Sequence, residues 1–88
     1  RKKLPIYFWR TYEGQEVDFI IDDRIAIEVK SAGKITNKHL KGIRCLMQEK
    51  SMEKCYLVSQ DPIELADNNI ILLHWESFIK KLWQGEIV

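Results

Sequence analysis

The sequence predicts an α/β or α+β domain, in which a mixed β-sheet is flanked by helices and the elements follow the order βββαββα. Two patterns predict this class. Apolar and polar residues alternate over 16–21 and 25–30, as they do in half-buried strands. Apolar residues then recur at helical spacing over 37–50, so a helix can carry the chain across to a parallel fourth strand.

The first third of the chain is expected to form a three-stranded antiparallel meander. Residues 4–13 are rich in the aromatic and β-branched side chains that strands favour. The next strands are expected over 16–22 and 25–30. Asp23-Arg24 or a neighbouring pair would make the tight turn between them, so these two strands would form a hairpin.

The rest of the chain is expected to add two helices and two strands. Thr36 or Asn37 offers an N-cap for the helix over 37–50. Strands are expected over 54–59 and 70–75, and a last helix over 76–84. All three tryptophans are expected in the core, although Trp9 could alternatively stack on a base.

Alternation assigns a face to each residue of the predicted hairpin. One face would carry Val17, Phe19, Ile21, Ile25, Ile27 and Val29. The other would carry Glu16, Asp18, Ile20, Ala26, Glu28 and Lys30. Acidic residues and Lys are depleted from strands. Three carboxylates and an ammonium group on one face therefore indicate a functional site.

The residue types on this face suit metal-dependent hydrolysis. Asp18 and Glu28 would lie about 5 Å apart across the hairpin, close enough to share one Mg²⁺ or Mn²⁺. Lys30 would stand beside Glu28, where it could orient water or stabilise negative charge on a phosphate. The carbonyl of Val29 is another candidate ligand. A structural alternative stays open, in which Lys30 pairs with either carboxylate and stabilises the hairpin by ~0.2–1 kcal/mol.

Asp18 followed by Glu28-Val29-Lys30 resembles the motif of the PD-(D/E)XK nuclease superfamily. The chain is more closely similar to a C-terminal domain of uncharacterised AAA-type ATPases. That similarity rests on three segments, Tyr7-Phe8-Trp9-Arg10, Gly14-Gln15-Glu16-Val17-Asp18-Phe19 and Ile27-Glu28-Val29-Lys30-Ser31.

The resemblance implies a restriction-endonuclease-like fold, with Asp18 and Glu28 binding metal and Lys30 assisting phosphodiester hydrolysis. The superfamily usually supplies another acidic residue from a helix before its first strand. Either such a helix lies upstream in a longer chain, or Glu16 takes its place as a metal ligand. The Pro-Asp form of the motif is absent, since Val17 precedes Asp18.

Four basic residues are candidates for nucleic-acid binding. Arg10 on the first strand could hold a phosphate, or it could pair with Glu16 or Asp18. Lys34, Lys38 and Lys41 could follow a DNA backbone, or they could form a solvated helix face. A net charge of +1, from 14 basic and 13 acidic residues, argues against a purely electrostatic nucleic-acid binder.

Length and composition set the remaining expectations. The 88 residues would form a single nuclease-like domain, expected to be a fragment of a longer chain because the sequence starts at Arg1 and not at Met. The resemblance implies that this longer chain is an ATPase. Cys45 and Cys55 lack CxxC spacing, which favours free thiols in a cytoplasmic protein. No segment approaches the ~18–20 apolar residues of a membrane span.

Two hypotheses on function remain. The first is a metal-dependent nuclease-like domain that acts on DNA and is appended to an AAA-type ATPase. The second is a catalytically inactive module that binds DNA or protein and retains the nuclease-like fold. Asp18, Glu28 and Lys30 favour the first hypothesis, whereas the missing upstream acid favours the second.

Overall fold

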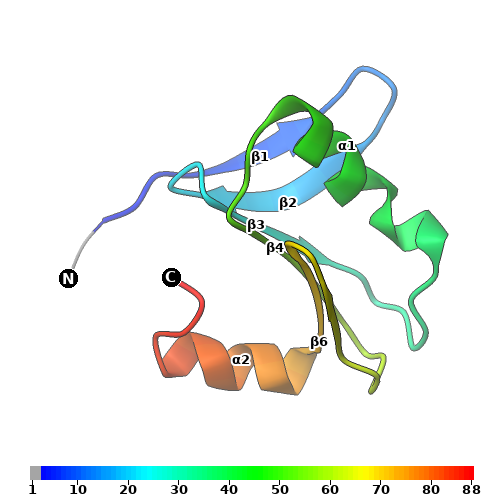
Figure 1. The fold of residues 1–88 in the computed structure, drawn as a ribbon, viewed down its shortest axis with the longest axis vertical. Helices are drawn as coiled ribbons and strands as arrows, with labels where there is room; N and C mark the ends of the chain where they lie inside the picture. Colours follow the sequence, from blue (N-terminus) through cyan, green and yellow to red (C-terminus); the bar gives the residue numbers. More distant parts are fainter. Residues whose placement is uncertain (1–2) are drawn as a thin grey trace.

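A computed structural model describes residues 3–88. Six strands form one mixed sheet in the order β1-β2-β3-β4-β6-β5. Figure 1 shows α1 and α2 on opposite faces of this sheet. The elements, in chain order, are β1 (Ile6–Arg10), β2 (Glu16–Ile21), β3 (Ile25–Val29), the 3₁₀ turn η1 (Asn37–Leu40), α1 (Lys41–Glu49), β4 (Lys54–Ser59), β5 (Leu65–Asp67), β6 (Ile70–His74) and α2 (Trp75–Trp83).

The predicted mixed sheet with flanking helices is confirmed. Strands β1, β2 and β3 form the antiparallel meander. Strands β3, β4 and β6 run parallel, and α1 makes the crossover between β3 and β4. The predicted element order βββαββα was wrong in one respect, because it lacked β5, which pairs antiparallel with β6 at the sheet edge. Strand β5 has three residues and all of them are exposed, so the sequence there shows no alternation of apolar and polar residues that would indicate a strand.

The turn between β2 and β3 lies one residue earlier than the first pair predicted. Asp22 and Asp23 both have positive φ, at 56° and 54°, and the N–H of Arg24 donates to the carbonyl of Ile21 at 3.0 Å. Positive φ at both central positions is the geometry of a type I′ turn, whose twist matches that of the flanking strands. This turn therefore fixes how β2 and β3 are connected in the hairpin that carries the candidate site.

The α1 face of the sheet carries one of two apolar clusters. Ile43 and Leu46 of α1 are fully buried against Val17, Ile20 and Leu57 of the sheet. Trp9 belongs to this cluster and is only 8% exposed, so its predicted place in the core is confirmed.

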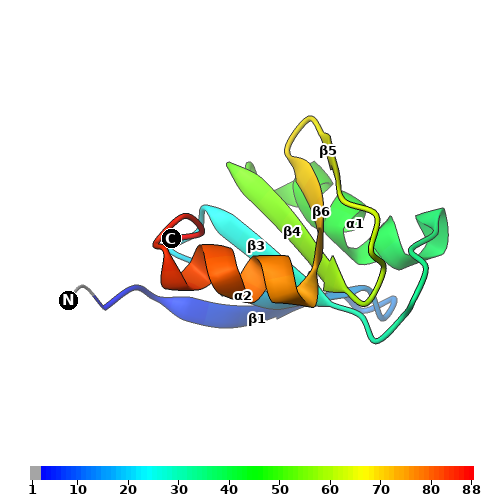
Figure 2. The same ribbon diagram turned by 90° about the horizontal axis from the view of Figure 1, so that it is seen from below.

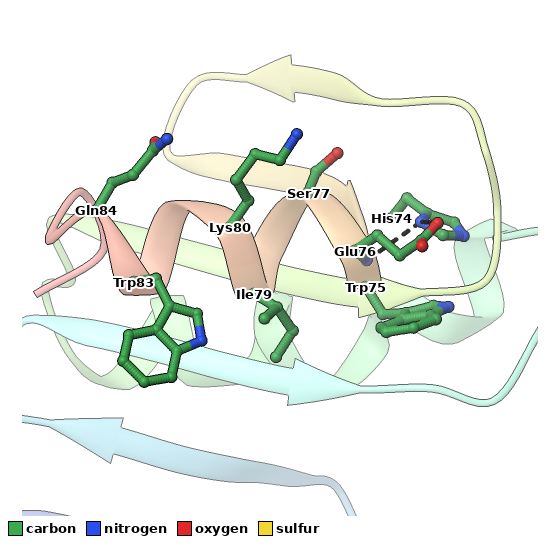
Figure 3. A pocket seen from close by; sticks show the side chains of 8 residues that line it. All are labelled: His74, Trp75, Glu76, Ser77, Ile79, Lys80, Trp83 and Gln84. Carbon is green, nitrogen blue, oxygen red and sulfur yellow. Dashed lines mark hydrogen bonds and ion pairs between the residues drawn. The ribbon is translucent and has the colours of Figure 1, made fainter.

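The second cluster lies under α2. Phe78 packs edge-to-face on Tyr56, with ring centroids 6.1 Å apart, and joins Ile25 and Ile27 of β3. The predicted burial of Trp75 and Trp83 was wrong, since these side chains are 49% and 86% exposed. Phe78 is the residue of α2 that is buried, whereas the two tryptophans lie along the flank of the helix (Figure 3).

The face of β1 and β2 beside α2 keeps apolar side chains in solvent. Helix α2 contacts β4 and β6. Figure 2, a view from below, shows α2 in front of the sheet and directly following β6. Phe19 and Val29, which alternation assigned to a core face, are each about half exposed and line a groove between the hairpin and α2. No helix within residues 3–88 is long and apolar enough to cross a membrane.

Gly42 allows α1 to pack directly on the start of β2. A methyl group at this position would collide with the backbone carbonyl of Glu16. We expect Gly42→Ala to lower the free energy of unfolding by about 1–2 kcal/mol, because overpacking against backbone outweighs the gain in helix propensity. Urea denaturation followed by circular dichroism would measure the change.

Gly33→Ala is the matched control, because a methyl group at Gly33 meets no atom within 4 Å. Its unfolding midpoint should stay close to that of the wild type. A Gly42→Ala variant as stable as Gly33→Ala would show that α1 can shift away from β2 at little cost.

Candidate active site on the β2–β3 hairpin

A β-bulge interrupts β2 at the candidate site. Tyr7 of β1 pairs with Ile20, whereas Trp9, two residues later, pairs with Val17. Strand β2 thus has one extra residue between these pairs, at Asp18-Phe19. Because of it, Val17 and Ile20 both reach the α1-face cluster, and the predicted strict alternation along β2 was wrong.

Beyond the bulge, side chains replace the backbone pairing of β2 with β3. The backbone register runs from Ile21↔Ile25 to Phe19↔Ile27. At the next position the backbone N–H of Asp18 donates to Oε1 of Glu28 at 3.0 Å. The N–H of Val29 donates to Oδ2 of Asp18 at 2.9 Å. Each carboxylate is therefore held in place by the backbone of the opposite strand.

Lys30 completes the cluster from the end of β3. Its Nζ lies 3.0 Å from Oε2 of Glu28, and its side chain is 35% exposed. The backbone N–H of Lys30 donates to the carbonyl of Val58 at 2.9 Å, which anchors this residue to β4. Asp18, Glu28 and Lys30 are thus brought together, as predicted, and the ion pair of the structural alternative is also present.

Glu28 is the most buried charged side chain of the cluster. It is only 4% exposed and shares the α1 face of β3 with Ala26. Burial raises the pKa of Glu28, and the adjacent Asp18 carboxylate raises it further, while the Lys30 ammonium acts in the opposite direction. Two carboxylates with one ammonium group leave an excess of negative charge, which a cation would stabilise.

Glu16 and Arg10 form a separate pair. Arg10 Nη2 lies 3.6 Å from Oε1 of Glu16, and the guanidinium also lies 5.2 Å from the centre of the Phe8 ring. Both charged side chains are well exposed. No group of three or more His, Cys, Asp or Glu side chains suited to a metal ion is found within residues 3–88. A divalent ion here would therefore depend on Asp18 and Glu28.

The three predicted lysines lie together along the chain after β3. Lys34 lies in the loop, Lys38 in η1 and Lys41 at the start of α1, and all three are exposed. The 3₁₀ turn begins after Thr36, whose N–H donates to Nδ1 of His39 at 3.0 Å, so the predicted cap is confirmed.

Asp61 fastens the loop that carries Lys34. Its carboxylate accepts hydrogen bonds from the N–H groups of Ile35 and Ile63, each at 2.9 Å, and these bonds lower the pKa of Asp61. Sequence reasoning missed this role, because an Asp before a Pro indicates only the end of a strand. No local pattern links Asp61 to a loop 26 residues earlier.

Comparison with known proteins identifies the family. A family described as a domain of unknown function (DUF4143) matches residues 1–78. The chain belongs to the DUF4143 family. This family is linked to the C-terminal regions of AAA-type ATPases, which confirms that part of the resemblance. No curated protein and no solved structure matches the chain.

The raised pKa of Glu28 gives stability a dependence on pH. Because the pKa of Glu28 in the folded state is raised above its ordinary value of 4.5, the folded state binds this proton more tightly than the unfolded chain does. This contribution to stability is complete below pH 4.5 and is lost as pH rises through the raised pKa. Glu28→Gln should remove that loss, so the variant should gain stability relative to wild type as the buffer changes from acidic to neutral.

Asp61→Asn should behave in the opposite way, because the pKa of Asp61 is lowered and its charged form stabilises the fold. This variant should lose stability relative to wild type at neutral pH and approach it in acid. Chemical denaturation at a series of pH values measures both differences. Parallel pH profiles for Glu28→Gln and wild type would contradict the assignment of a raised pKa.

Proposed function

We propose that this DUF4143 domain is a nuclease-like module of an AAA-type ATPase and hydrolyses phosphodiester bonds of DNA with a divalent metal ion. The convergence of Asp18, Glu28 and Lys30 carries the proposal. Two carboxylates and an ammonium group are held together by strand backbone, so little further ordering is needed when a substrate binds.

The donor chemistry of the site suits Mg²⁺ or Mn²⁺. Hard divalent cations use one or two carboxylates together with substrate phosphate and water. Each carboxylate of the pair gives one oxygen to a backbone N–H. Oδ1 of Asp18 is left for a cation, whereas Oε2 of Glu28 would have to be shared with Lys30 Nζ, which lies 3.0 Å from it. The chemistry that a bound ion supplies is Lewis acidity toward a phosphoryl oxygen.

Lys30 supplies a positive charge beside these carboxylates. Its ammonium group is held by Glu28 and is partly exposed to solvent, so it can donate a hydrogen bond to a substrate phosphate. In this role Lys30 would stabilise the negative charge that develops when water attacks phosphorus, or orient that water. Arg10, Lys34, Lys38 and Lys41 would contribute contacts to neighbouring phosphates, and Glu16 would serve as an auxiliary acid once released from Arg10.

A second candidate function is a catalytically inactive module that binds DNA or protein. The ion pair between Lys30 and Glu28 favours it, because this pair occupies an oxygen that a metal ion would need. The grouping of Glu16 with Arg10 favours it as well, since it leaves only two carboxylates at the cluster. The two functions differ in whether the cluster binds metal and cleaves DNA.

Metal binding can be measured apart from catalysis. We expect Mn²⁺ to broaden the amide NMR signals around Asp18, Glu28 and Lys30 before those of other residues, because the two carboxylates would hold the paramagnetic ion. Asp18→Asn should abolish this selectivity. Asp67→Asn, which changes an exposed carboxylate on β5, should leave it intact. Uniform broadening at millimolar Mn²⁺ would rule out a metal site in the cluster.

Catalysis makes a separate prediction. Cleavage of DNA in Mg²⁺ or Mn²⁺ should fall by about 10²-fold or more in Asp18→Asn and in Lys30→Met, since each removes a charge that acts on the reacting phosphate. Lys80→Met, an exposed lysine of α2, serves as the matched control. Equal activity in Lys30→Met and Lys80→Met would identify the cleavage as a contaminant and favour the inactive binding module.

A further inference from the structure

A groove joins Lys30 to Trp75 at the carboxyl ends of the parallel strands. It is lined by the ends of β3 and β4, the residues that follow each strand, and Trp75. The strands are in register at this edge, where Val29 pairs with Val58 and Ser59 pairs with His74. Lys30 and Trp75 therefore both line one hollow, together with Ser31 and Gln60.

Trp75 is exposed and yet held in place. It is the first residue of α2, directly after β6, and 49% of it is exposed. Its ring lies beside the imidazole of His74, with centroids 5.7 Å apart and planes tilted by 35°. His74 is itself fixed, because its N–H donates to Glu64 at 3.1 Å and its Nδ1 accepts from the N–H of Glu76 at 3.2 Å. Figure 3 shows the two rings side by side at the start of α2.

These features fit a nucleotide whose base is unstacked. An indole face binds a base by stacking, whatever the base, and an ammonium group binds the adjoining phosphate. A base inside a duplex cannot reach such a face, because its own neighbours cover it. We propose that the groove binds one nucleotide of a single-stranded nucleic acid, with its base on Trp75 and its phosphate toward Lys30.

This inference rests on the proposed function for the role of Lys30, and it adds a substrate class. Single strands, overhangs or flaps would be preferred to an intact duplex. DNA and RNA share the base and phosphate chemistry, so the inference covers single-stranded DNA and single-stranded RNA. A protein distinguishes the two by contacts to the 2′-hydroxyl of RNA.

Trp83 provides an internal control. It is more exposed than Trp75, at 86%, and lies on the same flank of α2 (Figure 3). Eight residues of helix separate the two, a rise of roughly 12 Å. Trp83 does not line the groove that contains Lys30. If exposed indole alone attracted nucleic acid, both tryptophans would contribute equally.

Binding is tested without metal, so that no cleavage occurs. Fluorescence anisotropy would follow a labelled oligothymidylate, the same length of oligouridylate and a DNA duplex, titrated with the protein in EDTA. We expect single strands to bind at least tenfold more tightly than the duplex. Trp75→Leu should weaken single-strand binding about tenfold. Trp75→Phe, which keeps an aromatic face, and Trp83→Leu should both stay within about twofold of wild type.

Each other outcome decides the question. Equal losses in Trp75→Leu and Trp83→Leu, or no loss in Trp75→Leu, would overturn the stacking site. A duplex bound as tightly as the single strands would overturn the substrate class. The Trp75→Phe variant shows whether a loss in Trp75→Leu reflects the aromatic face or the fold. Trp75-dependent binding by a protein that never cleaves DNA in Mg²⁺ would support the groove while contradicting the proposed catalysis.

Discussion

The candidate site depends on one exchange of hydrogen bonds between β2 and β3. Where backbone pairing of these strands ends, the N–H of Asp18 and the N–H of Val29 still need acceptors. The carboxylates of Glu28 and Asp18 provide them, at 3.0 and 2.9 Å. Two acidic side chains thus complete the edge of the ladder, and the same bonds fix the positions of their charges. The same carboxylates thus serve the pairing of β2 with β3 and the candidate site, so replacing either one affects the hairpin as well as the site.

The surrounding packing supports this exchange from two sides. On the β2 side, α1 approaches the carbonyl of Glu16 so closely that only glycine fits at position 42. On the β3 side, the hydrogen bond from Lys30 to Val58 continues the sheet into β4. Helix α1 thus packs against the start of β2, and β4 anchors the end of β3, on either side of the cluster, while Glu28 stays buried at a desolvation cost. Charged groups held at such a cost are typical of functional sites.

The sequence predicted the sheet class and the residues of the cluster, because both depend on local patterns. Alternation along β3 was correct, with Ile25 and Ile27 under α2 and Ala26 and Glu28 toward α1. Alternation along β2 failed at Asp18-Phe19, since a bulge depends on pairing with β1 and leaves no mark in the apolar pattern.

The sequence likewise predicted a last helix, over 76–84 instead of the observed Trp75–Trp83, but could not show how much of it the sheet covers. Phe78 is buried, whereas Trp75 and Trp83 on the flank are not, because α2 packs on β4 and β6 and leaves the hairpin beside it open. The width of a buried stripe depends on the position of the helix over the sheet, which is a tertiary property. The exposure of Trp75 was therefore hidden from the sequence.

The sheet topology explains why the two parts of the proposed site meet. Strands β3, β4 and β6 are parallel and in register, so all three end at the same edge, where α/β sheets commonly bind ligands. Glu28 and Lys30 reach this edge from the end of β3, and Trp75 reaches it because α2 begins directly after β6. The family match runs to residue 78, so it includes Trp75 and every strand of this edge but not Trp83. The matched residues thus include both the carboxylate cluster and the groove beside it.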